Sequence, residues 1–222
     1  VEAQNTTGVD HVRPFWVTLQ NWRRIVKDRL PEAAAPIRPI AVMAFDPNQP
    51  VFTTRDISTH VQSGLLLNDS QLLIDSLTHA EYEPCDGRRF GERDVGGEAE
   101  IGGQRFEISG VYKLGTGLAA NGSAIVSDRG FARLTPWNPQ MSTSFGLVCV
   151  SNESSIQQIQ QRLRRRFQVS ENTDLSSESV SVLTRHEALQ AERFRWLWQT
   201  PIGLIFQLGV VLSLIVGAAI VY

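Results

Sequence analysis

An unbroken apolar segment runs from Pro201 to Tyr222 and limits what this chain can fold into. The segment carries no charged side chain, and as a helix it would extend about 33 Å, enough to cross a hydrocarbon core of about 30 Å. A soluble core helix is rarely apolar on every face over this length, although a buried helix of a large soluble protein is the alternative. Its C-terminal position excludes a signal peptide. We predict a transmembrane helix over residues 201–222.

The residues just before this segment suit a membrane boundary. They combine basic and aromatic side chains, which anchor helices at the level of the lipid headgroups: Arg193, Arg195, Trp196 and Trp198. Further back, Thr184 and Glu187 have the spacing of a capping box, which predicts a helix start at Thr184. We expect a stiff connecting helix over residues 184–200 that leads into the membrane segment, with a kink at Pro201.

Small residues recur every four positions within the apolar segment, at Gly209, Ser213 and Gly217. This spacing places them on one helix face, where small side chains let a second transmembrane helix approach closely. Gln207 is a polar side chain that favours a partner over lipid. We expect this face to pack against another helix.

The remainder of the chain predicts an α+β fold, with residues 1–183 forming one extracytoplasmic domain. Strands and helices alternate without a regular βαβ rhythm. Strands are expected at 12–26, 37–45, 71–74, 98–114 (a hairpin turning at Gly102 and Gly103), 124–126, 145–150 and 180–183. Short helices are expected at 54–61 and 128–134. A longer amphipathic helix is expected where Ile156, Ile159, Leu163 and Phe167 recur at helical spacing.

Catalytic and cofactor motifs are weak throughout the sequence. Residues 115–120 fit the pattern G-x-G-x-x-A, but Asn121 and Gly122 interrupt the helix that a dinucleotide site needs, so a loop is the preferred interpretation. No Walker A sequence occurs, and the four histidines are scattered without metal-ligand spacing. We therefore expect a non-enzymatic chain without a cofactor or a metal. The formal net charge of −2 gives no indication of nucleic-acid binding.

Two features leave alternatives open. Arginines 162, 164, 165 and 166 form the densest basic cluster; a solvated helix face is preferred, and contact with anionic lipid or a partner protein is the alternative. Cys85 and Cys149 are too few to define a disulfide framework. Two buried thiols are preferred over a disulfide between them.

The end of the chain resembles the domain-to-membrane junction of DevC-type ABC exporter permeases, within the FtsX/MacB permease superfamily. Residues 181–222 carry the likeness, with Leu183-Thr184-x-x-Glu187, an aromatic and basic stretch, and then Thr200-Pro201-Ile202-Gly203. Four further stretches match in order: 44–47 with 50–52, 73–75 with 81–84, 106–117 with 120–122, and 126–128 with Phe131. The first 36 residues match weakly.

The resemblance implies a four-helix permease with a MacB-like periplasmic domain between its first two membrane helices. Such permeases are inner-membrane proteins that act as dimers with a separate ABC ATPase subunit. In the DevC-type subgroup they also work with a membrane-fusion protein and an outer-membrane channel, and they are linked to glycolipid export. Residues 1–200 would then lie on the periplasmic side. Since the chain begins at Val1 and ends within the apolar run, it is expected to be an internal fragment.

Two alternatives to an exporter permease remain. Within the same superfamily, a lipoprotein-release or cell-division permease would differ in cargo. From another class, a membrane-anchored sensor or receptor would bind a ligand with its outer domain.

Overall fold

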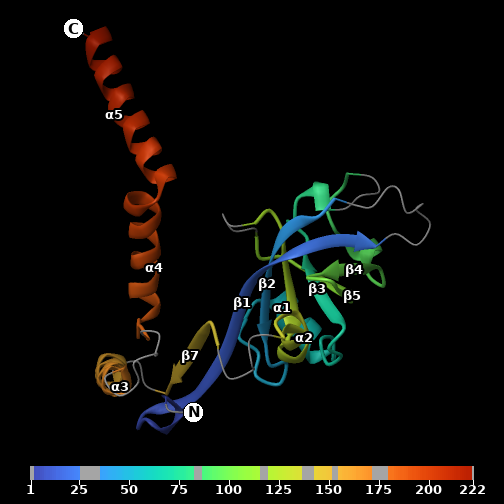
Figure 1. Cartoon of the computed structure of the whole chain (residues 1–222). Coiled ribbons are helices and arrows are strands. Elements are labelled where there is room, and N and C mark those ends of the chain that lie inside the picture. The colour runs from blue at the N-terminus through green and yellow to red at the C-terminus, as the bar shows by residue number, and fades with distance from the viewer. Residues whose placement is uncertain are drawn as a thin grey trace. The chain divides into compact units, whose positions relative to one another are not determined.

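The computed structural model describes residues 3–25, 36–82, 87–115, 120–136, 143–151, 155–171 and 180–221 (Figure 1). The chain divides into two compact units. We call His11–Cys149 the sheet unit, and Val1–Asp10 together with Val150–Tyr222 the helical unit. The sequence-based boundaries at residues 183 and 200 stay predictions.

The strands form a mixed seven-stranded sheet in the order β2-β6-β3-β5-β4-β1-β7. Their bounds are β1 Val9–Ile25, β2 Arg38–Phe45, β3 Gln71–Asp75, β4 Glu98–Ile101, β5 Gln104–Tyr112, β6 Ser123–Ser127 and β7 Phe145–Val150. Strand β2 runs parallel to β6 and β3 runs parallel to β5, whereas β3 and β6 are antiparallel. The strands expected near these positions are therefore confirmed.

Strand β1 is long enough to pair with two different neighbours. Its residues Phe15–Trp22 pair antiparallel with β2, and its residues Trp22–Ile25 pair antiparallel with β4. Because β2 and β4 lie at opposite ends of the series β2-β6-β3-β5-β4, these pairings close six strands into a ring. Trp22 lies at the crossover and is buried, and its indole N–H donates to the Tyr82 carbonyl oxygen at 3.3 Å.

Both faces of β2 are buried, which explains its almost continuous apolar sequence. Val42 and Ala44 belong to one hydrophobic cluster, whereas Met43 and Phe45 belong to a second one. Successive side chains of a strand point to opposite faces, so the two clusters lie on the two sides of the sheet. Helix α2 (Asp128–Leu134) packs into the first cluster and α1 (Arg55–Gln62) into the second.

The β4–β5 hairpin turns at Gly102 and Gly103, as predicted. Their φ angles are 56° and 82°, a left-handed conformation that glycine adopts without steric cost. Short 3₁₀ turns occur at Ala3–Asn5, Ala80–Tyr82 and Glu92–Asp94.

A buried polar network holds Gly115, the first residue of the G-x-G-x-x-A pattern at 115–120. The Asp75 carboxylate accepts hydrogen bonds from the Gly115 N–H at 2.7 Å and from the Ser123 hydroxyl at 3.2 Å. The Tyr112 hydroxyl lies 2.9 Å from the Ser123 oxygen, and burial raises the pKa of its phenol well above the ordinary value. Residues 116–119 lie outside the described residues, and the next regular element is strand β6.

The helical unit contains α3 (Ile156–Glu171), α4 (Arg185–Phe194), a π-helical turn (Arg195–Gln199) and α5 (Pro201–Val221). The predicted amphipathic helix is confirmed, since Ile159 and Leu163 are buried. The N-terminal segment packs closely on α3, because a Cβ atom built on Gly8 would lie 2.9 Å from the Ile159 Cδ1 atom.

Two further expectations concern individual segments. The strand expected at 180–183 is wrong, because these residues have no strand pairing and the Val182 carbonyl oxygen instead accepts hydrogen bonds from Gln160 and Arg164 side chains.

Cys149 is a half-buried free thiol. Cys85 lies outside the described residues, so the relation between the two cysteines stays a prediction.

Candidate functional site

Helix α4 begins with a capping box. The Thr184 hydroxyl oxygen accepts a hydrogen bond from the Glu187 N–H at 3.2 Å, and the Glu187 carboxylate accepts one from the Thr184 N–H at 2.8 Å. Thr184 has extended backbone angles, as an N-cap residue requires. These two bonds satisfy backbone donors that the first turn of the helix leaves unpaired.

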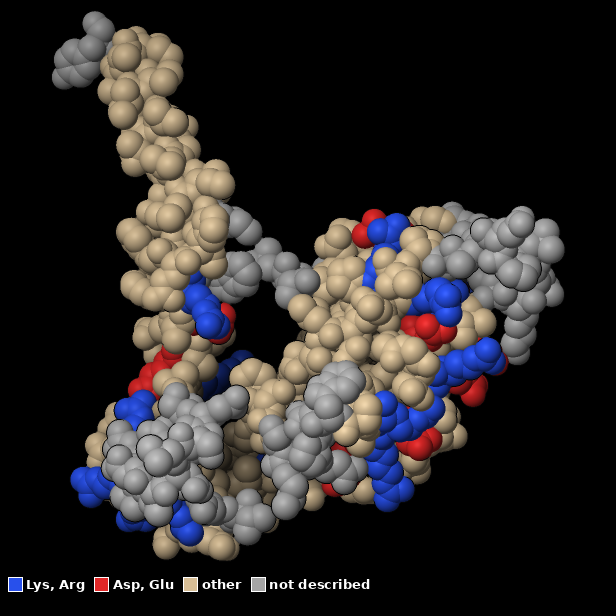
Figure 2. Space-filling view, in the orientation of Figure 1, with Lys and Arg blue, Asp and Glu red and all other residues tan. Residues whose placement is uncertain are grey.

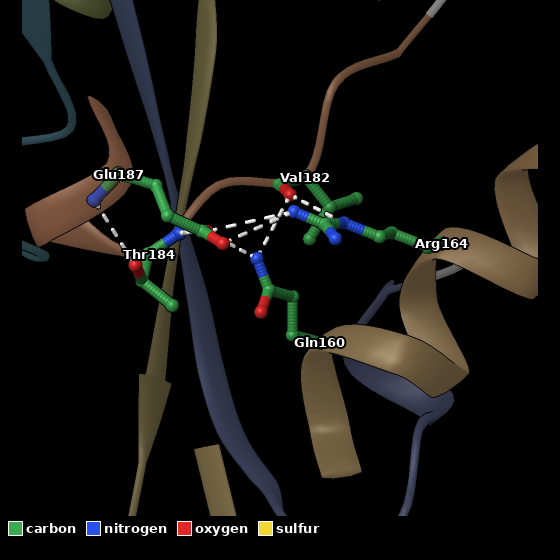
Figure 3. Close-up of polar contacts among 5 residues, drawn as sticks. All are labelled: Gln160, Arg164, Val182, Thr184 and Glu187. Carbon is green, nitrogen blue, oxygen red and sulfur yellow. Dashed lines mark hydrogen bonds and ion pairs between the residues drawn. The ribbon is translucent and has the colours of Figure 1, made fainter. Parts of the chain in front are cut away.

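The same carboxylate also reaches α3 (Figure 3). The Gln160 side-chain amide donates to Glu187 and, at 3.2 Å, to the Val182 carbonyl oxygen. The Arg164 guanidinium donates to the Val182 carbonyl oxygen at 3.0 Å and lies 3.4 Å from a Glu187 oxygen. Glu187 therefore ties the start of α4 to two side chains spaced one helical turn apart on α3. We call Gln160, Arg164, Val182, Thr184 and Glu187 the α3–α4 junction.

Several donors around Glu187 favour its charged form. The Thr184 N–H, the Gln160 amide and the Arg164 guanidinium together lower the pKa of this carboxyl below its ordinary value. The side chains of Glu187 and Arg164 are about two-fifths exposed, so solvent screens their ion pair. The junction is thus a partly hydrated contact rather than a buried ion pair.

The helical path changes geometry before it reaches the apolar helix. Residues Arg195–Gln199 are π-helical, and Thr200 is extended, with φ −105° and ψ 148°. A residue that precedes proline is disfavoured in the α conformation, so Pro201 forces this break. The Thr200 hydroxyl then caps α5 by accepting from the Gly203 N–H at 3.2 Å. The kink expected at Pro201 is thus a full interruption of the helical backbone at Thr200, between the π-helical turn and α5.

A side chain of α5 bridges this break. The Gln207 amide donates to the Leu197 carbonyl oxygen at 2.8 Å. In an α-helix that carbonyl would accept from residue 201, which is a proline and has no N–H. Gln207 was expected to prefer a polar partner over lipid, and Leu197 provides one; its packing against another helix stays a prediction. We call Leu197, Thr200 and Gln207 the α4–α5 junction.

The other residues that the sequence singled out lie on α5 or just before it. The Arg195 guanidinium lies 3.5 Å from the Glu192 carboxylate, Trp198 is exposed, and the Trp196 side chain lies outside the described part. A Cβ atom built on Gly209 or Gly217 would meet no atom within 4 Å, so this face is open. The roles of these arginine, tryptophan and glycine residues at a membrane stay predictions.

Helix α5 is long and apolar enough to cross a membrane. Its window Gly203–Ile220 has a mean hydropathy of 2.3, and only 6% of that window is buried. Among the described residues, no group of histidine, cysteine, aspartate and glutamate side chains could hold a metal ion. In the helical unit, α5 is linked to α4 through the α4–α5 junction, and α4 is linked to α3 through the α3–α4 junction.

Sequence reasoning located Thr184 and Glu187 but missed Gln160 and Arg164. Arg164 was assigned to a solvated face, whereas it contacts Glu187 and Val182. Two features of the sequence could have indicated them. Gln160 and Arg164 have an i, i+4 spacing beside the apolar stripe of α3, and Arg164 is opposite in charge to the capping residue Glu187.

Comparison with known proteins gives structural likeness without sequence likeness. No protein-family model and no curated protein sequence matches the chain. The extracellular domain of the noncanonic ABC-type transporter YknZ from Gram-positive bacteria matches with a TM-score of 0.50 and 16% identity, over 82% of this chain and 86% of that chain. The periplasmic region of MacB from Actinobacillus actinomycetemcomitans gives a TM-score of 0.47 and 8% identity, over 86% of this chain and 79% of that chain.

The likeness to YknZ establishes the fold. This chain has the mixed α+β architecture found in the extracellular domain of an ABC-type transporter, and an apolar helix follows it. The predicted α+β fold class is confirmed.

Proposed function

We propose that the chain is part of the permease subunit of an ABC-type exporter and is itself non-catalytic. In this proposal α5 crosses the inner membrane, and residues 1–200 lie on the extracytoplasmic side. The observation that carries the proposal is the combination of a transporter-like outer domain with an apolar helix on one chain, joined through hydrogen-bonded junctions.

The two junctions provide a route for motion from the membrane to the outer domain. Movement of α5 reaches the π-helical turn through the bond between Gln207 and Leu197. Helix α4 then carries it to Glu187, which contacts α3 through Gln160 and Arg164. Backbone hydrogen bonds make each helix stiff, so displacement is concentrated at the two junctions.

In this proposal a separate ABC ATPase subunit supplies the energy, as the resemblance of residues 181–222 to DevC-type exporters implies. The resemblance of residues 181–222 to DevC-type exporters supports a permease homodimer. The same resemblance supports a membrane-fusion protein and an outer-membrane channel as partners, with a lipid-like or other hydrophobic cargo.

Orientation is tested by thiol labelling of cells whose inner membrane is kept intact. Gln190 is an exposed residue of α4, so Gln190→Cys in a background with Cys85→Ser and Cys149→Ser provides one reporter. A membrane-impermeant thiol reagent is expected to label it after only the outer membrane has been opened. Labelling that also requires rupture of the inner membrane would contradict the proposed orientation.

Coupling is tested with the permease purified together with its ATPase and reconstituted in vesicles. Arg164→Gln with Glu187→Gln is expected to lower export severalfold while ATP hydrolysis continues, because the helices then move without transmitting force. Arg165→Gln with Glu192→Gln makes the same charge change outside the α3–α4 junction and serves as the control. Failure of any ATPase to co-purify, or equal export by both double variants, would contradict the proposal.

A further inference from the structure

A cleft lies between the N-terminal segment and α3 within the helical unit. The described residues that line it are Asn5, Thr6, Thr7, Arg162 and Arg166. Its volume is about 400 Å³, within the lower part of the range of small-molecule sites. These described residues contribute hydroxyl, amide and guanidinium groups, and none of them is a carboxylate. Such a lining favours an anion over a neutral or cationic ligand.

Two arginines of α3 line this cleft. Arg162 and Arg166 are four residues apart on α3 and therefore share a helix face. Arg162 donates to the Thr7 carbonyl oxygen at 3.2 Å, which fixes its side chain and leaves other N–H donors unused. Among the described residues, Arg166 has no acidic partner. Basic side chains gather over the part of the molecule where α3 lies (Figure 2).

Thr6 is a second polar feature of this cleft. This residue lines the cleft and is 9% exposed, and its hydroxyl oxygen has no hydrogen-bond partner among the described residues. A buried hydroxyl without a partner is destabilising, so a ligand oxygen that accepted its hydrogen bond would remove that cost.

We propose that this cleft binds a phosphate group through Arg162, Arg166 and the Thr6 hydroxyl. Guanidinium groups offer paired N–H donors that match two oxygens of a phosphate, and two guanidiniums compensate its charge. The phosphate is carried either by an anionic lipid headgroup or by a soluble phosphate compound. The site does not depend on the proposed transport role.

The test uses the whole chain in nanodiscs and follows amide hydrogen exchange of residues 3–9 and 156–166. One arm adds inorganic phosphate to protein in phosphatidylcholine nanodiscs. The second arm replaces part of the phosphatidylcholine with phosphatidic acid. Slower exchange in these two segments is expected in at least one arm. Protection by inorganic phosphate assigns the site to a soluble phosphate, whereas protection by phosphatidic acid alone assigns it to a lipid headgroup.

Variants separate a built site from general attraction to positive charge. Arg166→Gln is expected to raise the half-saturating concentration of the effective probe by about tenfold, as loss of a charge-assisted hydrogen bond implies. Arg165→Gln removes the same charge from an exposed neighbour that does not line the cleft, and is expected to change it less than about twofold. Thr6→Val is expected to weaken binding without loss of fold. Absence of protection in both arms, or equal effects of Arg165→Gln and Arg166→Gln, would overturn the proposal.

Discussion

The side-chain amide of Gln207 donates to the carbonyl oxygen of Leu197, ten residues earlier, across the extended backbone of Thr200. Pro201 removes the N–H that this carbonyl would meet in a continuous helix, and the glutamine supplies a replacement. The break between α4 and α5 is thus bridged by a side-chain hydrogen bond in addition to the Thr200 cap.

Gln207→Leu is expected to loosen this joint. It leaves the Leu197 carbonyl unpaired and costs about 0.6–1.7 kcal/mol, the range for polar contacts within membranes. Spin labels on α4 and α5 should report a broader distance distribution by pulsed electron resonance. Gln199→Leu makes the same change in the π-helical turn, where the Gln199 side chain makes no described hydrogen bond. An unchanged distribution for Gln207→Leu would show that Thr200 and Pro201 alone fix the joint.

Thr184→Ala is expected to destabilise the start of α4. It removes the hydroxyl that accepts from the Glu187 N–H, and loss of an N-cap side chain costs about 1 kcal/mol. Hydrogen exchange in residues 185–188 should accelerate about fivefold, the factor that corresponds to this free energy. Thr184→Ser keeps the hydroxyl and should exchange nearly as the wild type does. Equal acceleration in both variants would assign the effect to the lost methyl group.

The α3–α4 junction should weaken in acid. The pKa of Glu187 is lower in the folded chain than its ordinary value of 4.5, so its stabilising contribution is present above that pH. The contribution is lost as the pH falls through the folded-state pKa, because the protonated carboxyl loses its charged contacts. Exchange at the start of α4, corrected for its intrinsic pH dependence, should rise below pH 4.5. Glu187→Gln should abolish this rise, and its persistence would point to another group.

Tyr112→Phe is expected to lower the free energy of unfolding of the sheet unit by about 1 kcal/mol. The phenol hydroxyl is buried and pairs with the Ser123 hydroxyl, which in turn donates to Asp75. A double-mutant cycle with Ser123→Ala, measured by chemical denaturation, should show that the two losses are not additive. Additive losses would mean that the two hydroxyls contribute independently.

Leucine at Gly209 and at Gly217 is expected to reduce permease dimer crosslinking and export. Neither position has an atom within 4 Å of an added Cβ, so the chain itself tolerates the larger side chains. The effect would therefore arise at a partner helix that approaches the small-residue face. Val211→Leu enlarges roughly the opposite face and should leave crosslinking intact. Full crosslinking in the glycine variants would contradict this interface.

Local sequence patterns predicted most of the individual elements. The strand residues 38–45, the glycine turn at 102–103 and the apolar stripe through Ile159 and Leu163 each carry their own signal. The double pairing of β1 was not predictable, because hydrogen bonds to β2 and β4 leave no distinct periodicity in β1 itself. The closure of the six-stranded ring depends on pairings between strands that are distant in the sequence.

The α3–α4 junction also combines residues that local sequence reveals with residues that it does not. The capping box depends on two residues three positions apart, so sequence spacing revealed Thr184 and Glu187. The role of Arg164 depends on Val182 and Glu187, which lie 18 and 23 positions away. A branched apolar stretch at 180–183 suggested a strand, but side-chain donors from α3 occupied its backbone.

The division of the chain into units has a consequence for biogenesis. The helical unit contains both Val1–Asp10 and Val150–Tyr222, so the whole sheet unit is translated between its two parts. The Thr7 carbonyl reaches the ribosome's exit long before Arg162, its hydrogen-bond donor. Because domains fold as units during synthesis, the sheet unit can fold first. Completion of the helical unit then coincides with the emergence of α5; if α5 crosses the membrane as proposed, maturation of the domain and insertion of this helix become one late event.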